Sequence, residues 1–380
     1  MKHAAWLLLA ACGAAQAVFD CDIGGQHVNP ANGSTTAGKT GLMRCKDRDS
    51  GLLQREQELR AGQFMGLVRF YENGRLQKEH SVNTQGNMQG RAREFGPDGK
   101  VLFEGEYENG SLRGLARRFH PNGQLRRVSF HAADGDREPQ AAAEFTTQGR
   151  LGDLRCGAKA QLAPAFDDAR SCGFGGAPSS AELFHERGHM QARGTWLQGQ
   201  RIRFDRLDEQ GQIRQSEEVD GPRRIEREFG ANGVKRRERE RVVTGREIRS
   251  ERLQEFSERG SLAREQKWAE GRMVSDNQFY LNGQPRRSTE WSWNDRIATI
   301  SEKEFHDDGG TATTSRWTEQ RGQRTPVGSH LRFNTARRQV GERIYDQNGR
   351  LTRERAWDDA GNLVRDDEVF EDGSRKAFSR

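Results

Sequence analysis

The sequence predicts an all-β protein, an elongated antiparallel meander of β-hairpins that forms one long, twisted, single-layer sheet. The first observation is a repeat of about 24 residues: an aromatic residue is followed four positions later by glycine, and most successive aromatics lie 23 to 27 residues apart. The second is composition, because 32% of residues are hydrophobic and 31% are charged, whereas a domain with a thick core is nearer half apolar. Aromatics at a fixed phase also argue against disorder.

Each repeat is predicted to be one hairpin whose corner is marked by glycine. Asn-Gly and Asp-Gly favour tight hairpin turns because both positions accept positive φ. A second set of glycines falls 12 or 13 residues from the first. One hairpin alone is marginal in water, so successive hairpins must support one another. The predicted corner residues are Phe70, Gly74, Phe95, Gly99, Phe119, Gly123, Phe145 and Gly149.

The repeat spacing also divides the chain into segments. Residues 18–50 are rich in Gly, Asn, Thr and Ser and lack the repeat, which predicts an N-terminal capping segment. Hairpin repeats are expected over 51–155. The aromatic spacing then grows to 39 residues, which predicts an inserted loop at 156–180. Degenerate repeats are expected over 181–380, with a second long interval between the aromatics at 305 and 345.

Residues 1–17 have the features of a signal peptide: a short basic start, about a dozen apolar residues, and the small-x-small sequence that ends at Ala17. We therefore expect cleavage after Ala17 and export to the periplasm or cell surface. The alternative is a lipobox, Leu9-Ala-Ala-Cys12, which would place a lipid on Cys12. No later stretch approaches the ~20 apolar residues of a membrane span, so none is expected.

Four cysteines remain beyond residue 17, and an even number in an exported chain predicts disulfides. They are Cys21, Cys45, Cys156 and Cys172. Of the three pairings that four cysteines allow, short loops favour Cys21 with Cys45 and Cys156 with Cys172. The alternative is that one pair stays reduced. Zinc is not indicated, because no C-x-x-C spacing occurs.

The charged residues are closely interleaved, as in residues 223–241, although the formal net charge is +6. Mixed signs at this density predict cross-strand ion pairs on a solvated sheet. A nucleic-acid-binding protein more often has a patch of one sign, so no nucleic-acid partner is expected.

Residues 66–76 and 105–125 resemble the MORN-repeat-variant family, often labelled YwqK-type antitoxin. The resemblance covers 51–151 well and 181–310 loosely, and residues 345–351 also resemble the YD repeats of secreted shell-forming proteins. The family resemblance implies a MORN-like β-hairpin repeat and a binding role, in some members as an antitoxin or immunity partner. It implies no catalytic residues. The export signal, the cysteines and the degenerate later repeats depart from the family and argue against an intracellular antitoxin.

Two short motifs match sites of enzymes. His185-Glu186-Arg-Gly-His189 fits H-E-x-x-H, which binds zinc with the glutamate as base when it lies on a helix. Here Phe184 and Gly188 occupy repeat positions, so the repeat predicts a turn instead. Residues 33–40 fit the P-loop pattern but lack the strand before it and the helix after it that phosphate binding requires. Neither motif is expected to bind a metal or cofactor.

These observations predict a non-enzymatic, exported repeat protein that binds another protein. Immunity against an envelope-targeted toxin is the most specific version. The alternatives are a structural scaffold of the cell envelope and a zinc peptidase that uses His185, Glu186 and His189. Because open sheet edges can pair, an edge-to-edge homodimer is a further expectation.

Overall fold

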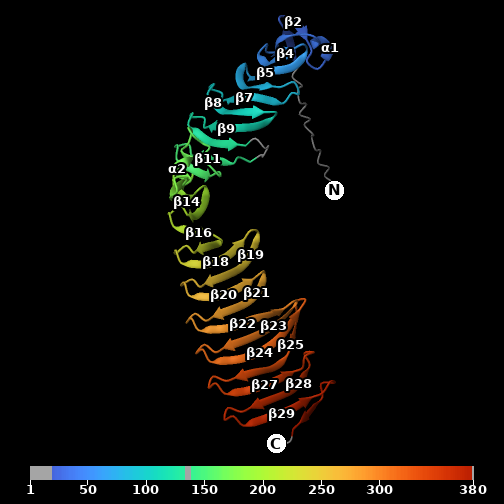
Figure 1. Ribbon diagram of the computed structural model, residues 1–380, viewed down its shortest axis with the longest axis vertical. Coiled ribbons are helices and arrows are strands. Elements are labelled where there is room, and N and C mark those ends of the chain that lie inside the picture. The colour runs from blue at the N-terminus through green and yellow to red at the C-terminus, as the bar shows by residue number, and fades with distance from the viewer. Residues whose placement is uncertain (1–18, 133–137, 379–380) are drawn as a thin grey trace, which may run out of the picture. The chain divides into compact units, whose positions relative to one another are not determined.

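A computed structural model describes residues 19–132 and 138–378, and it confirms the predicted all-β antiparallel meander (Figure 1). The strands form two open sheets rather than the single sheet expected. The break falls at the inserted segment between the strands at 151–155 and 179–184. By compactness the chain divides into residues 1–189 with 196–200, and residues 190–195 with 201–380.

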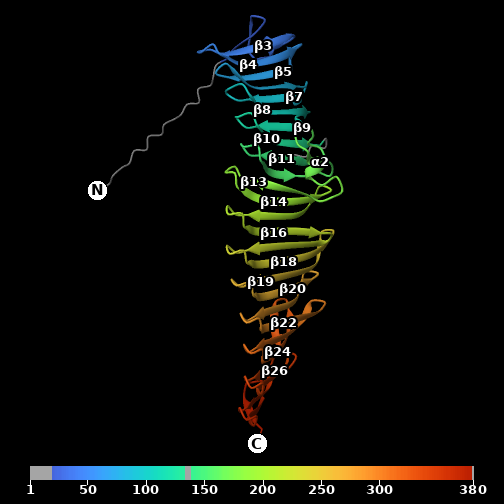
Figure 2. The ribbon, with the colours of Figure 1, turned by 90° about the vertical axis from the view of Figure 1, so that its left-hand side faces the viewer.

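The first sheet has 12 strands in the order β12-β11-β10-β9-β8-β7-β6-β5-β4-β3-β1-β2. Figure 2 shows β3 to β10 following one another across this sheet. The strands are β1 (Phe19–Ile23), β2 (Gln26–Val28), β3 (Gly41–Asp47), β4 (Leu53–Arg60), β5 (Gln63–Glu72), β6 (Arg75–Val82), β7 (Met88–Phe95), β8 (Val101–Glu108), β9 (Ser111–Phe119), β10 (Leu125–His131), β11 (Ala141–Phe145) and β12 (Leu151–Arg155).

The second sheet has 18 strands in sequence order, with an additional pairing between the strands at 311–320 and 328–333. The strands are β13 (Ser179–Phe184), β14 (Met190–Leu197), β15 (Gln200–Leu207), β16 (Ile213–Asp220), β17 (Arg223–Phe229), β18 (Lys235–Thr244), β19 (Glu247–Phe256), β20 (Leu262–Ala269), β21 (Arg272–Phe279), β22 (Pro285–Asn294), β23 (Ile297–Phe305), β24 (Thr311–Gln320), β25 (Gln323–Pro326), β26 (Gly328–Phe333), β27 (Gln339–Tyr345), β28 (Leu351–Trp357), β29 (Leu363–Val369) and β30 (Arg375–Ala377).

Two kinds of turn connect the strands. Between β5 and β6, Asn73 and Gly74 form a two-residue turn with φ of 51° and 74°. Between β7 and β8 the turn is longer: Gly96 N donates to Lys100 O and Gly99 N donates to Gly96 O. The four predicted corner glycines, Gly74, Gly99, Gly123 and Gly149, all have positive φ.

The predicted corner aromatics lie at or near strand ends. Phe95, Phe119 and Phe145 are the last residues of β7, β9 and β11 and are half-buried. Phe70 is different, because β5 continues past it to the tighter turn. Its side chain is 38% exposed and stacks on His80, with the Arg55 guanidinium 5.5 Å from its ring centroid.

The first sheet buries small apolar clusters on one face. Successive side chains of a strand point to opposite faces, so Met43 and Cys45 lie on the face opposite Arg44. One cluster consists of Cys21, Val28, Met43, Cys45 and Leu59, and another of Ala92, Phe103 and Ala116. Each cluster is small, as the low apolar content predicts.

Two helices of four residues each occur in the described part of the chain. Helix α1 (Gly33–Thr36) begins after Asn32, whose side chain accepts a hydrogen bond from Ser34 N. Helix α2 (Asp168–Ser171) lies in the inserted segment, where the buried Asp168 accepts hydrogen bonds from the backbone N of Gln161 and Leu162. Neither helix has the length or apolar character to cross a membrane.

Candidate binding site

The H-E-x-x-H match lies in the turn after β13 and not on a helix. His185 N donates to His189 O at 2.9 Å, and the two imidazole rings stack with centroids 4.9 Å apart. Glu186 accepts hydrogen bonds from N and Oγ1 of Thr147, both at 3.0 Å. These bonds hold the pKa of Glu186 below its usual value. The carboxylate therefore joins two turns, whereas a metalloprotease motif needs two imidazoles one helical turn apart.

The P-loop match also lacks its structural context. Residues 33–36 form the short helix α1, and the strand before it, β2, has only three residues. No long helix follows, because β3 begins at Gly41. In the described residues, no group of three or more His, Cys, Asp or Glu side chains is placed to hold a metal.

The four predicted cysteines form two disulfides, Cys21–Cys45 and Cys156–Cys172. The first joins β1 to β3 within an apolar cluster, and the second closes the inserted segment. Disulfides persist in oxidising compartments, so these two disulfides indicate an extracytoplasmic location. The expected cleavage site at Ala17 and the alternative lipid site at Cys12 lie outside the described residues.

A row of alternating charges crosses the other face of the first sheet, and we call it the Arg-Glu ladder. Its members face one another in register on consecutive strands. Ion pairs join most neighbours, with N–O distances of 3.2 Å for Arg44–Glu56, 3.3 Å for Arg69–Glu56 and 2.9 Å for Arg117–Glu104. On β7, the partner of Glu104 is Arg91, at 3.0 Å. The ladder consists of Arg44, Glu56, Arg69, Glu79, Arg93, Glu104 and Arg117.

Glu56 is the most enclosed carboxylate of the ladder, with 6% of the residue exposed. Burial disfavours its ionisation, but hydrogen bonds from Tyr71, Arg44 and Arg69 outweigh burial and lower the pKa of Glu56. Burial together with the bond to Glu56 raises the pKa of Tyr71 to about 12. Glu56 is therefore ionised and paired within the ladder at neutral pH, which suits a structural role.

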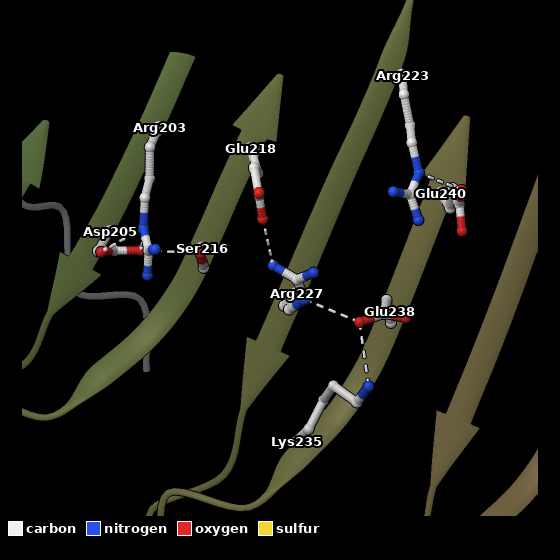
Figure 3. Close-up of polar contacts among 9 residues, drawn as sticks. All are labelled: Arg203, Asp205, Ser216, Glu218, Arg223, Arg227, Lys235, Glu238 and Glu240. Carbon is white, nitrogen blue, oxygen red and sulfur yellow. Dashed lines mark hydrogen bonds and ion pairs between the residues drawn. The ribbon is translucent and has the colours of Figure 1, made fainter. Parts of the chain in front are cut away.

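The second sheet has similar networks (Figure 3). Arg227 of β17 lies between two carboxylates, donating to Glu218 at 3.0 Å and to Glu238 at 2.8 Å. Lys235 donates to the same Glu238 at 3.0 Å. Burial opposes ionisation of Glu238, but the bonds from Arg227 and Lys235 outweigh it and lower the pKa of Glu238. These are the cross-strand ion pairs that the interleaved charges predict.

The regular meander of the second sheet is interrupted at β24. The end of β24 pairs with the short strand β25, whereas the start of β24 pairs with β26. Next to this fork is a hollow of about 520 Å³. Trp317, His330 and Tyr345 line one side, with ring centroids 4.9 Å apart for Trp317–His330 and 4.7 Å apart for His330–Tyr345. We call it the Trp317 hollow.

Small residues form the floor of the Trp317 hollow. Arg332, Gly341, Ala356 and Arg365 face one another in register on β26 to β29, so two small side chains separate two arginines. The Arg332 side chain lies along Gly341, with its Nε 3.5 Å from the position of a Cβ there. The missing side-chain volume at Gly341 and Ala356 creates the depression.

The Trp317 hollow carries an excess of positive charge. Its lining includes four arginines, Arg332, Arg343, Arg355 and Arg365, against two glutamates. Glu354 is already bound by Arg343 at 3.0 Å and Arg365 at 3.4 Å, and also by Arg375. Arg332 is exposed, and it has no ion-pair partner among the described residues. Arg332 is therefore a cation available to a ligand.

Sequence reasoning did not identify the residues of this hollow. The three rings lie on three strands. The fork at β24 places Trp317 beside His330, and the pairing of β26 with β27 places His330 beside Tyr345. The one available signal was the long interval between the aromatics at 305 and 345, which marks the departure from the regular meander.

One segment of the first sheet matches a known family model. The model is described as MORN repeat variant, and its match spans β7, the following turn and β8. The chain contains a MORN repeat variant at residues 88–109. The MORN-variant hairpin contributes Arg93 and Glu104 to the Arg-Glu ladder, on the face opposite Ala92 and Phe103.

Three solved structures have distant similarity to the chain. A crystal structure of TarM is 15% identical with a TM-score of 0.19, and the match covers 24% of this chain and 18% of TarM. A crystal structure of TcdB2-TccC3 is 10% identical with a TM-score of 0.18, covering 88% of this chain and 18% of that one. A mutant Tc holotoxin pore of Photorhabdus luminescens is 11% identical with a TM-score of 0.16, covering 93% and 20%. No curated protein matches the chain.

Proposed function

We propose that this protein is a non-enzymatic, exported repeat protein that binds another protein through the Trp317 hollow, as the immunity partner of an envelope-targeted toxin. The observation that supports binding is the composition of the hollow. Trp, Tyr and Arg are the residue types that dominate the binding energy of protein interfaces, and here Trp317, Tyr345 and Arg332 line one depression.

Two further observations support the remaining parts of the proposal. The disulfides fit a partner met outside the cytoplasm. The H-E-x-x-H motif places its glutamate on Thr147 in a turn, which favours a binding role over zinc catalysis. The immunity role, which is the most specific form of the proposed binding function, comes from the family resemblance.

Affinity capture from the extracytoplasmic extract of the native host tests the proposal. The immobilised full chain is compared with Trp317→Ala and with a matched control, Trp268→Ala, whose side chain lies in β20 outside the hollow. We expect one protein to be retained by the wild type and by Trp268→Ala and lost with Trp317→Ala. Retention of no protein would reject the binding function.

The immunity role is tested separately with the captured partner. Exported alone into host cells that lack this protein, the partner should stop growth, and co-expression of the wild type but not of Trp317→Ala should restore it. A captured partner that is harmless in the envelope would reject immunity and leave a scaffold role for the complex.

A further inference from the structure

We infer that the Trp317 hollow recognises an acidic segment of its protein partner, in which a carboxylate pairs with Arg332 and a neighbouring apolar or aromatic side chain packs on Trp317. This inference rests on the proposed protein-binding function and specifies the chemistry that the site selects. Three properties of the hollow support it: its charge, its shape, and the ion pairs and hydrogen bonds that its lining residues already form.

Most charged side chains that line the hollow already form ion pairs. Glu354 is 9% exposed, and arginines such as Arg343 and Arg365 already pair with its carboxylate. Arg365 is further occupied by Asp367 at 2.7 Å. Arg332 keeps all its donors, and a guanidinium presents them in a planar fork that fits a carboxylate bidentately. Among the described arginines that line the hollow, Arg332 alone has no ion-pair partner, so it is the cation that an incoming anion meets.

The surface beside Arg332 is a depression with an aromatic wall. Gly341 and Ala356 lower the sheet surface, and the rings of Trp317, His330 and Tyr345 form a wall along it. The ring nitrogens of that wall are partly committed within the protein. Trp317 Nε1 donates to Ser315 Oγ at 3.1 Å, and His330 Nε2 lies 2.8 Å from the Arg316 carbonyl oxygen. The wall therefore offers ring surface for packing, and Arg332 supplies the polar recognition.

A peptide fits this combination because it can place an acidic side chain next to an apolar one. Alternate residues of an extended segment point in the same direction, so one can reach Arg332 while another packs on Trp317. An acidic oligosaccharide is the main competing ligand, since sugar rings also stack on aromatic residues. The experiment below therefore includes both chemistries.

The test uses fluorescence anisotropy with the purified full chain and short labelled peptides in which Glu and Phe stand two residues apart, as in Glu-Ser-Phe, so that both side chains point the same way. The matched probes carry Gln or Lys in place of every Glu, and oligogalacturonate serves as the acidic carbohydrate. We expect the Glu-Phe peptide to bind at least about tenfold more tightly than the Gln-Phe peptide, as for a hydrogen bond to a charged group. The Lys-Phe peptide should not bind.

Variants of the protein locate the effect. Arg332→Gln and Trp317→Ala should each weaken the Glu-Phe peptide at least about tenfold, and Arg332→Lys should restore part of the affinity because it keeps the charge without the fork. The control is Arg296→Gln, an exposed arginine in the turn between β22 and β23. It should bind like the wild type. Circular dichroism should show that the variants at Arg332 and Arg296 keep the native fold, because both residues are exposed.

Three results would overturn the inference: equal binding of the Glu and Gln peptides, undiminished binding by Arg332→Gln, or tighter binding of oligogalacturonate than of the peptide. The capture experiment separates this inference from the proposed function. A partner lost with Trp317→Ala but retained by Arg332→Gln would keep protein binding and reject the acidic ligand. If the peptide binds but no partner is captured, the acidic-ligand site at Arg332 is supported and the proposed protein-binding function is rejected.

Discussion

At the scale of single residues, turn chemistry determines where the chain reverses. The left-handed region is costly for residues with a Cβ and open to glycine. Gly74 has φ of 74° in a two-residue turn, and Asn73 beside it also has positive φ. Both positions of this turn need positive φ, and Asn and Gly are the residues that tolerate it. The Asn-Gly dipeptide was therefore sufficient to predict the corner.

Gly74→Val should destabilise the first sheet by about 1–3 kcal/mol, because a β-branched residue is held at positive φ. Space is not the cause, since a Cβ there would only contact Leu52 at 3.4 Å. The matched control is Gly175→Val, because Gly175 has no positive φ and no atom within 4 Å of its Cβ position. Thermal melting of both variants checks this, and equal melting temperatures would show that the corner is not strained.

At the scale of strands, the Arg-Glu ladder shows how a sheet with little apolar surface holds its register. Each carboxylate contacts arginines on both neighbouring strands, as Glu56 contacts Arg44 and Arg69. A slip of one residue would turn these side chains to the opposite face. It would therefore place charges against the apolar cluster around Met43 and break several pairs at once.

Glu56→Gln should lower the free energy of unfolding by about 1–2 kcal/mol at pH 7, because the negative charge between two arginines is lost and one accepting oxygen becomes an NH2 group that cannot accept. We take the low end because 57% of the Arg44 side chain and 36% of the Arg69 side chain are exposed, which screens the pairs. Urea unfolding measures the difference. The control is Glu106→Gln, an exposed residue of β8 without an ion pair in the described chain, for which a change below about 0.5 kcal/mol is expected.

The same variant has a defined pH dependence. The pKa of Glu56 is lower in the folded state than in the unfolded chain, so its ionised form stabilises the fold above the unfolded value of about 4.3. This contribution is lost as the pH falls through the lower, folded pKa. The difference between wild type and Glu56→Gln should therefore be full at neutral pH and shrink in acid. A difference that stays constant down to about pH 3 would contradict ionic stabilisation by Glu56.

The ladder also marks the limit of prediction from sequence. Interleaved charges predict that cross-strand pairs exist, but not which residues meet. The register shifts by a bulge between Glu94 and Phe95, just before the turn, and similar shifts recur at other corners. Partner identity thus depends on bulges that have no distinct sequence signal. The Trp317 hollow is also hidden in the sequence, because Trp317 meets His330 where β24 pairs with two strands and no sequence pattern specifies that fork.

At the scale of the whole molecule, the structure explains how a chain with 32% hydrophobic residues stays ordered. Both open sheets rely on hairpin turns, backbone ladders and ion pairs more than on a thick core. The lack of a thick core is clearest in the second sheet from β15 onward, where few hydrophobic residues of the described chain are buried. They are Phe204, Ile225, Leu253, Ala298, Ile300 and Val369.

This architecture predicts an unusually small heat-capacity change on unfolding. Exposure of apolar surface raises the heat capacity and exposure of polar surface lowers it, and here unfolding exposes little apolar and much polar surface. We therefore expect a value per residue clearly below the ~12–15 cal/mol/K of ordinary globular proteins. Calorimetry at several pH values, with the unfolding enthalpy plotted against the melting temperature, gives this quantity. A slope within the ordinary range would show that the chain buries a conventional core, and would contradict a fold held together chiefly by turns, backbone ladders and rows of charge.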